Sequence, residues 1–408
     1  MESKATPRRF ISALLSGGVV AVTAAVGLVA GTPVAAQPSL LSQSSLSSLS
    51  ATSSGSSSSE MKLREAIVGS SEDPEQSGAL LGLVASSISL SSLPGFAVHP
   101  PKEAPPIPDP TITEVSVLSR EMVDEQRRIE RWQIASPAMG RVIPVDIRLP
   151  KTANAPQLVM LDGVEAAKES DWLYASGQRF FNKVLGEEDV TVIVPIGGMG
   201  SWYADWVEDD PVLGRNQWET FIIKEVLLLM ENPDFGYNGK RAIGGISMGA
   251  TAAIRMAEAN PELFDATFGI SGCYSTRSAM GELSMRSVVE SRGGKIENML
   301  GKRDNPAWNR ADTVSHPEGL RNVEVYMSAA TGALPNVPRP DELSMNDLVT
   351  SILLERGVYD CTKEMDAAMR DHGMGHHKVN YVHYGVHNWN TFNVELEPAW
   401  NHVKRVLY

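Results

Sequence analysis

The chain has 408 residues, enough for one large or two ordinary domains, and a formal net charge of -13 from 36 basic and 49 acidic side chains. No basic segment interleaves with aromatic residues, so the composition argues against nucleic acid as a partner.

The N-terminus has the pattern of a secretory signal peptide. Arg8 and Arg9 precede an uncharged apolar run over residues 10–31, and small residues follow at 34–36. We predict cleavage after Ala36 and export to the cell envelope or beyond. The alternative is an uncleaved membrane anchor, because the run is about 20 residues long.

Residues 37–110 are predicted to form a linker. The serine-rich tract 39–59 has too few large apolar residues to build a core, so we expect it to be disordered. Residues 99–110 include six prolines, which predicts an extended spacer. No further low-complexity break follows, so residues 111–408 are predicted to form one α/β domain.

Within this domain, strand and helix patterns alternate. We expect an antiparallel hairpin at a sheet edge from 128–134 and 141–149. Buried strands are predicted at 157–161, 190–195, 242–246, 266–271, 323–328 and 379–384, and helices at 218–230, 250–259, 348–355, 362–372 and 397–407. This alternation predicts a mainly parallel sheet covered by helices on both faces.

The segment from Gly245 to Gly249 fits the G-x-S-x-G nucleophile elbow, with Ser247 at its centre. A serine oxygen reaches a substrate carbonyl only when a sharp turn exposes it, and the strained turn needs small neighbours. An apolar strand before the motif and an alanine-rich helix after it support this interpretation over a chance match.

A serine is a poor nucleophile at neutral pH until a base accepts its proton. His387 lies just past the last predicted strand, where the α/β-hydrolase order places the histidine. His383 is expected inside that strand, pointing into the sheet packing. A cluster of histidines at 372, 376 and 377 lacks a carboxylate set, so we expect a solvated loop, and we predict no metal and no cofactor.

The acid that orients the histidine should follow the strand at 323–328. By position alone Glu355, Asp341, Glu342 and Asp360 all qualify, and Glu355 ranks first only narrowly.

An oxyanion hole needs two N–H donors. The turn Leu161-Asp162-Gly163-Val164 follows an earlier predicted strand, so the Val164 N–H could pair with the Met248 N–H. Asp162 could instead be a turn former that bonds its own backbone.

Several separated motifs together resemble the secreted mycolyltransferases, that is the antigen 85 complex and its corynebacterial relatives. The resemblance runs from about Arg128 to the C-terminus. It rests on the elbow and on S-P-A-M-G-R from 136, L-D-G from 161, S-W-Y-A-D-W from 201, W-E-T-F from 218, L-E at 354–355 and H-N-W from 387.

The resemblance implies an α/β-hydrolase fold with a Ser247–Glu355–His387 triad, and so selects Glu355 among the acids. It also implies an oxyanion hole from the Val164 and Met248 backbone. Asp162 and Trp389 are implied to line a trehalose pocket. Family members transfer a mycolyl group from trehalose monomycolate, through an acyl-serine, to trehalose monomycolate, arabinogalactan or a protein hydroxyl.

Two departures from the family stand out. Glu165 occupies the place of an arginine that helps to hold trehalose in the mycobacterial enzymes, and the cysteine pair near the W-E-T-F helix is missing. Instead, Cys273 and Cys361 are present, and in an exported chain we expect them to pair. Two buried thiols are the alternative. A bridge would fix the loop that carries the acid.

Two other functions fit the same fold. A secreted carboxylesterase would share the triad and differ only in the acceptor of the acyl group. A binding module would need a dead site, against which the intact set of Ser247, Glu355 and His387 argues.

Overall fold

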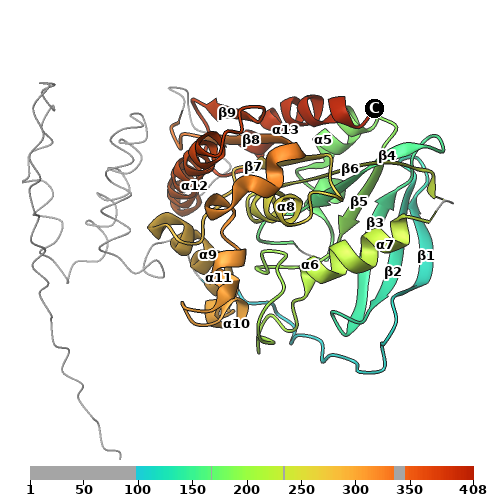
Figure 1. Cartoon of the computed structure of the whole chain (residues 1–408). Coiled ribbons are helices and arrows are strands. Elements are labelled where there is room, and N and C mark those ends of the chain that lie inside the picture. The colour runs from blue at the N-terminus through green and yellow to red at the C-terminus, as the bar shows by residue number, and fades with distance from the viewer. Residues whose placement is uncertain (1–97, 167, 233–234, 335–344) are drawn as a thin grey trace, which may run out of the picture. The chain divides into compact units, whose positions relative to one another are not determined.

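The computed structural model describes residues 98–408 except 167, 233–234 and 335–344. The predicted signal peptide, the serine-rich tract, Asp341 and Glu342 lie outside the described residues. Figure 1 shows the described part as a sheet with helices on both sides. Within this part, no helix is both long and apolar enough to cross a membrane.

Nine strands form one sheet in the order β1-β2-β3-β5-β4-β6-β7-β8-β9. The antiparallel section contains β1 (Ser116–Asp124), β2 (Ile129–Ser136) and β3 (Arg141–Arg148), and β3 runs antiparallel to β5 (Thr191–Pro195). From β5 onward all neighbours are parallel, through β4 (Ala155–Leu161), β6 (Tyr237–Ile246), β7 (Ala266–Ile270), β8 (Glu324–Ala330) and β9 (Lys378–Val382). The predicted mainly parallel sheet is confirmed.

The predicted hairpin forms β2 and β3, but it is not the edge of the sheet. β1 pairs with β2 outside it. Most β1 side chains are exposed, including Leu118 and Met122, so β1 lacks the apolar alternation by which a half-buried strand is recognised.

Two groups of helices cover the two faces of the sheet, each with its own apolar core (Figure 1). One face carries α6 (Trp218–Thr220), η3 (Phe221–Val226), α7 (Leu227–Met230), α8 (Met248–Ala259), α9 (Ala279–Ser291), α10 (Ile296–Leu300), α11 (Pro306–Arg310), η6 (Pro317–Asn322) and α12 (Met345–Asp371). The other carries α4 (Asp171–Tyr174), α5 (Gln178–Phe180), η2 (Phe181–Leu185) and α13 (Trp389–Val403). The short turns η5 (Thr313–Ser315) and η7 (Lys404–Val406) complete the chain.

Two helix predictions were wrong in extent. The two predicted segments belong to one helix, α12, which continues through Gly357 and ends at Asp371 rather than 372. Gly357 leaves room for the Met280 side chain, because a Cβ there would lie 2.8 Å from Met280 Sδ. The last helix begins at Trp389 rather than 397, since the Asn388 side chain caps it by accepting from the Thr391 N–H. Pro398 lies inside α13.

The described proline-rich residues lie extended along the domain. The His99 N–H donates to the Ser291 carbonyl at 2.7 Å, and the Asp109 N–H donates to the Gly140 carbonyl at 2.7 Å. Gly140 has φ +60, and a Cβ there would lie 2.8 Å from Pro108 Cβ. This segment is therefore bonded to the domain surface at both ends.

The predicted disulfide between Cys273 and Cys361 is confirmed. It joins the segment after β7 to α12 and closes a span of 88 residues, which the chain-entropy model values at roughly 4 kcal/mol. The expectation that the bridge fixes a loop is wrong, because Glu355 and Cys361 both lie on α12.

Candidate active site

Ser247 lies at the junction of β6 and α8 in a strained backbone conformation, with φ 53 and ψ -120. The glycines on either side have no room for a side chain. A Cβ on Gly245 would lie 2.5 Å from the Gly249 carbonyl carbon, and a Cβ on Gly249 would lie 2.4 Å from the Leu161 carbonyl oxygen. The strand–turn–helix setting expected for the motif is therefore present, and it explains both glycines.

His387 lies between Ser247 and Glu355. Its Nε2 is 2.8 Å from Ser247 Oγ, and its Nδ1 is 2.7 Å from Glu355 Oε2. The backbone N–H of His387 also donates to the Ser351 carbonyl of α12 at 2.9 Å. Three segments that are distant in sequence thus meet in one hydrogen-bonded chain at the carboxyl ends of the parallel strands.

Glu355 is fully buried, yet its carboxylate has several hydrogen-bond donors. Oε1 accepts from Ser271 Oγ and from the Ala330 N–H, each at 2.7 Å, while Oε2 faces His387. Ser271 directly follows β7 with φ 56, and Ala330 ends β8. A buried charge is tolerated only when it is paired and hydrogen-bonded, which this arrangement provides. Sequence reasoning missed both supporting residues.

The other described candidates for the acid and the base, Asp360 and His383, are not part of this hydrogen-bonded chain. Asp360 forms an ion pair with Arg356 at 3.3 Å on α12. His383 lies past the end of β9 and is exposed, so the expectation that it points into the sheet is wrong.

The clustered histidines have separate partners. His377 Nε2 lies 2.7 Å from Asp366 Oδ1, and His376 Nε2 lies 3.2 Å from the Val323 carbonyl oxygen. His372 Nδ1 lies 2.8 Å from the Ala368 carbonyl oxygen. Among the described residues, no group of three or more metal-ligating side chains is gathered in one place.

A cavity of about 190 Å³ opens above Ser247. Its floor includes Ser247, His387, Val164 and Met248, so both predicted oxyanion donors adjoin the serine. One face of α9 lines the cavity, at the helical spacing of Ser284, Ser287, Val288 and Ser291. One face of α12 also lines it, with Thr350, Leu354 and Val358.

Neither Asp162 nor Trp389 is among the residues that line this cavity. Asp162 is 3% exposed, and burial raises its pKa to about 8. Its N–H donates to the Tyr203 hydroxyl at 3.2 Å. Trp389 is half-buried at the start of α13, where its ring packs edge-on against Trp172 with centroids 5.2 Å apart.

Arg292 lines the cavity and is 7% exposed. Its guanidinium donates to Glu165, which directly follows Val164, while Nη1 donates to the Ser291 carbonyl at 3.3 Å. Arg292 Nε has no hydrogen-bond partner within the described part of the chain. The pair links the loop of a predicted oxyanion donor to the end of α9. No sequence pattern indicated it.

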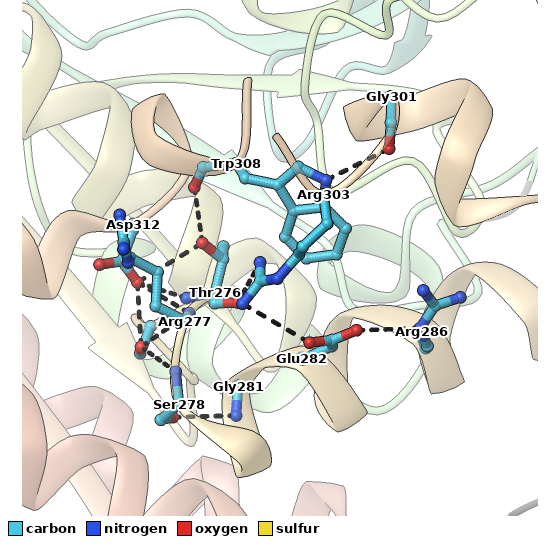
Figure 2. A network of polar contacts seen from close by, with 11 residues as sticks. Thr276, Arg277, Ser278, Gly281, Glu282, Arg286, Gly301, Arg303, Trp308 and Asp312 are labelled. Carbon is cyan, nitrogen blue, oxygen red and sulfur yellow. Dashed lines mark hydrogen bonds and ion pairs between the residues drawn. The ribbon is translucent and has the colours of Figure 1, made fainter. Parts of the chain in front are cut away.

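A polar network holds the α9 wall in place (Figure 2). At its start, Ser278 Oγ accepts from the Gly281 N–H at 3.1 Å, and buried Asp312 accepts from the Thr276 N–H at 2.5 Å. Further along, Glu282 pairs with Arg286 at 3.3 Å and with Arg303 at 3.5 Å. The helix is thus fixed on the side away from the cavity.

A family model described as "Putative esterase" matches residues 136–403, more than half of the chain. The chain belongs to this esterase family. Among solved structures, it is similar to MPT51 (FbpC1) of Mycobacterium tuberculosis, with TM-score 0.56, 20% identity and coverage of 71% of this chain and 99% of that one. It is also similar to an S-formylglutathione hydrolase from Agrobacterium tumefaciens, with TM-score 0.53, 16% identity and coverage of 72% and 100%. These likenesses confirm the predicted α/β-hydrolase fold.

Curated relatives of this esterase include mycolyltransferases. The diacylglycerol acyltransferase/mycolyltransferase Ag85A of Mycobacterium leprae is 28% identical over 288 residues, covering 66% of this chain and 80% of the relative. Ag85A of Mycobacterium tuberculosis is 28% identical over 289 residues, covering 68% and 81%. Ag85B of Mycolicibacterium smegmatis is 27% identical over 297 residues, covering 68% and 85%. The predicted resemblance to mycolyltransferases is confirmed.

Proposed function

We propose that this protein is an acyltransferase that forms an acyl-enzyme on Ser247. One observation carries the proposal: His387 bonds Ser247 Oγ through Nε2 and buried Glu355 through Nδ1. In that arrangement the imidazole is held in the tautomer that can accept the serine proton, and the carboxylate stabilises the imidazolium that results.

In the first half-reaction, Ser247 Oγ attacks the ester carbonyl of the donor as its proton passes to His387 Nε2. Val164 and Met248 line the same cavity as Ser247, and their N–H groups would donate to the developing oxyanion. Collapse of the tetrahedral intermediate breaks the ester bond, and the leaving alcohol takes the proton from His387. An acceptor hydroxyl then reverses these steps and carries the acyl group away.

The proposed donor is trehalose monomycolate, and the proposed acceptor is trehalose monomycolate, arabinogalactan or another hydroxyl of the cell envelope. The names of the Ag85 relatives support the mycolyl group. Trehalose contacts by Asp162 and Trp389 stay predictions, as does export with cleavage after Ala36.

A carboxylesterase is the second candidate, and the esterase family model favours it. Hydrolase and transferase share the first half-reaction, so they differ only in whether water or a sugar hydroxyl reaches the acyl-serine. Product analysis therefore separates them, whereas the identity of the nucleophile does not.

The test is to incubate the purified protein with trehalose monomycolate and resolve the lipids by chromatography. We expect trehalose dimycolate with wild type and none with Ser247→Ala. Free mycolic acid without dimycolate, at all donor concentrations, would identify a hydrolase. Product from Ser247→Ala at the wild-type rate would refute the acyl-serine.

A further inference from the structure

A second cavity, of about 520 Å³, lies far from Ser247 along the strands. It is lined by the turn between β1 and β2, the end of β3, and α5 with η2. Arg148 at the end of β3 pairs with Val192 near the start of β5, whereas Ser247 follows the end of β6. The two cavities therefore lie at opposite ends of the parallel strands.

Arginines and amides dominate this second cavity. Its lining includes Arg127, Arg128 and Arg148, together with the amide side chains of Gln126, Gln178 and Asn182. Ligand cavities of this size are common in proteins, but they are usually lined mainly by apolar groups. A cavity lined by guanidinium and amide groups instead suits a charged, hydroxylated ligand.

The positive charges are incompletely balanced by protein groups. Asp124 pairs with Arg127 at 2.7 Å, and Glu187 at the rim is 92% exposed. Within the described residues, no carboxylate lies within 4 Å of the guanidinium nitrogens of Arg128 or Arg148. Two arginines therefore face the cavity without a carboxylate partner.

The hydrogen bonds of Arg148 explain its presence as a structural residue, whereas those of Arg128 do not. Arg148 is 2% exposed and donates to the carbonyls of Leu185, Glu188 and Val190, so it caps the end of η2. Among the described residues, the Arg128 side chain donates one hydrogen bond, from Nε to the Leu149 carbonyl at 3.2 Å. Both terminal nitrogens of Arg128 are without a hydrogen-bond partner among the residues described.

The backbone at Arg128 is also strained. Its φ is 59, and its N–H donates to the Glu125 carbonyl at 3.2 Å to close the turn. Glycine adopts this conformation freely, whereas the Cβ of any other residue makes it sterically unfavourable. Glycine would fit this position of the turn without strain. The chain instead has an arginine there, and its side chain lines the cavity.

We propose that this cavity binds a sugar that carries an oxyanion, either a phosphate or a carboxylate. The terminal nitrogens of Arg128 form the fork that matches two oxygens of such a group. Arg148 adds a buried positive charge to the lining, and the amides of Gln126, Gln178 and Asn182 provide donors and acceptors for hydroxyls. The site is independent of the acyl-transfer chemistry.

Calorimetric titration of the full chain at low ionic strength tests the proposal, with glucose 6-phosphate, glucuronate and glucose as probes. We expect at least one of the two anionic sugars to bind, and glucose to bind at least tenfold more weakly. The stronger anionic probe identifies phosphate or carboxylate as the recognised group. Added salt should weaken binding, because it screens the guanidinium charge.

Two substitutions at the turn sharpen the test. Arg128→Gly relieves the strained φ, so the variant should fold, and it should lose about tenfold in affinity because a charge-assisted hydrogen bond is removed. Arg128→Lys keeps the charge without the fork and should lose less. Arg292→Gln, in the other cavity, should bind as wild type. Equal binding by Arg128→Gly and wild type, or no binding of either anionic sugar to wild type, would overturn the proposal.

Discussion

The two sides of the cavity above Ser247 are built differently. On the strand side, positions are set by backbone: Ser247 and Ser271 both have positive φ at strand ends, and the Ala330 N–H bonds Glu355 directly. On the helix side, α9 presents side chains whose hydroxyls turn back to their own helix, as Ser287 does to the Ser284 carbonyl at 3.0 Å.

This difference separates two tasks. Strained backbone at strand ends persists only where surrounding structure determines it, and such rigidity suits groups that must stay aligned during a reaction. Side chains on a helix face can be substituted without a change in the backbone, which suits contacts that select a substrate. We therefore expect variants on the strand side to change kcat, and variants on the helix side to change KM.

The largest effect should follow from Ser247→Ala. Alanine removes only the nucleophile, so the variant should fold normally and lose roughly 10⁶-fold in kcat. Wild type should also be labelled by a serine-directed phosphonate, and the variant should not. Labelling of a different serine in the wild-type protein, found by peptide mapping, would remove Ser247 from the chemistry.

Glu355→Gln should come next, with a loss of about 10⁴-fold in kcat, because the imidazole would lose the charge that sets its tautomer. Asp360→Asn is the matched control on the same helix, since Arg356 is the one cation paired with Asp360 in the described part of the chain. It should retain wild-type turnover at equal thermal stability. The reverse result, a crippled Asp360→Asn beside an active Glu355→Gln, would show that the acid is misassigned.

A smaller effect is expected on the helix side. Arg292→Gln should raise KM about tenfold and leave kcat within about twofold. Arg292 lines the cavity, and its hydrogen bonds among the described residues go to Glu165 and Ser291 rather than to the triad. Arg286→Gln is the control, because Arg286 lies on the same helix but pairs with Glu282 and Glu290 away from the cavity. A tenfold fall in kcat for Arg292→Gln at constant KM would contradict the expectation that helix-side variants change KM rather than kcat.

The sequence predicted the strand side better than the helix side, and the reason is physical. The elbow needs glycine two positions before and two positions after the serine, because a Cβ on Gly249 would lie 2.4 Å from the Leu161 carbonyl oxygen. The motif therefore occupies five consecutive positions. His387 was found from its place after the last strand. Such local constraints leave a pattern that can be recognised without any knowledge of packing.

Contacts between distant segments leave no such pattern. Position alone could not separate Glu355 from Asp360; the register of α12 does so, because it turns Glu355 toward Ser271, which is 84 residues away in sequence. Arg292 and Glu165 are separated by 127 residues. β1 was missed for a different reason. Most of its side chains are exposed, so its sequence lacks the apolar alternation that identifies a half-buried strand.

The smallest effect should come from Ser271→Ala, which tests how far the strand side is over-determined. The substitution removes one of the two donors to Glu355 Oε1 and leaves the Ala330 N–H in place. One lost hydrogen bond of this kind is worth about 0.5–1.5 kcal/mol, so kcat should fall roughly threefold to tenfold with KM unchanged. A loss as large as that of Glu355→Gln would mean that Ser271, rather than the backbone at Ala330, holds the carboxylate in place.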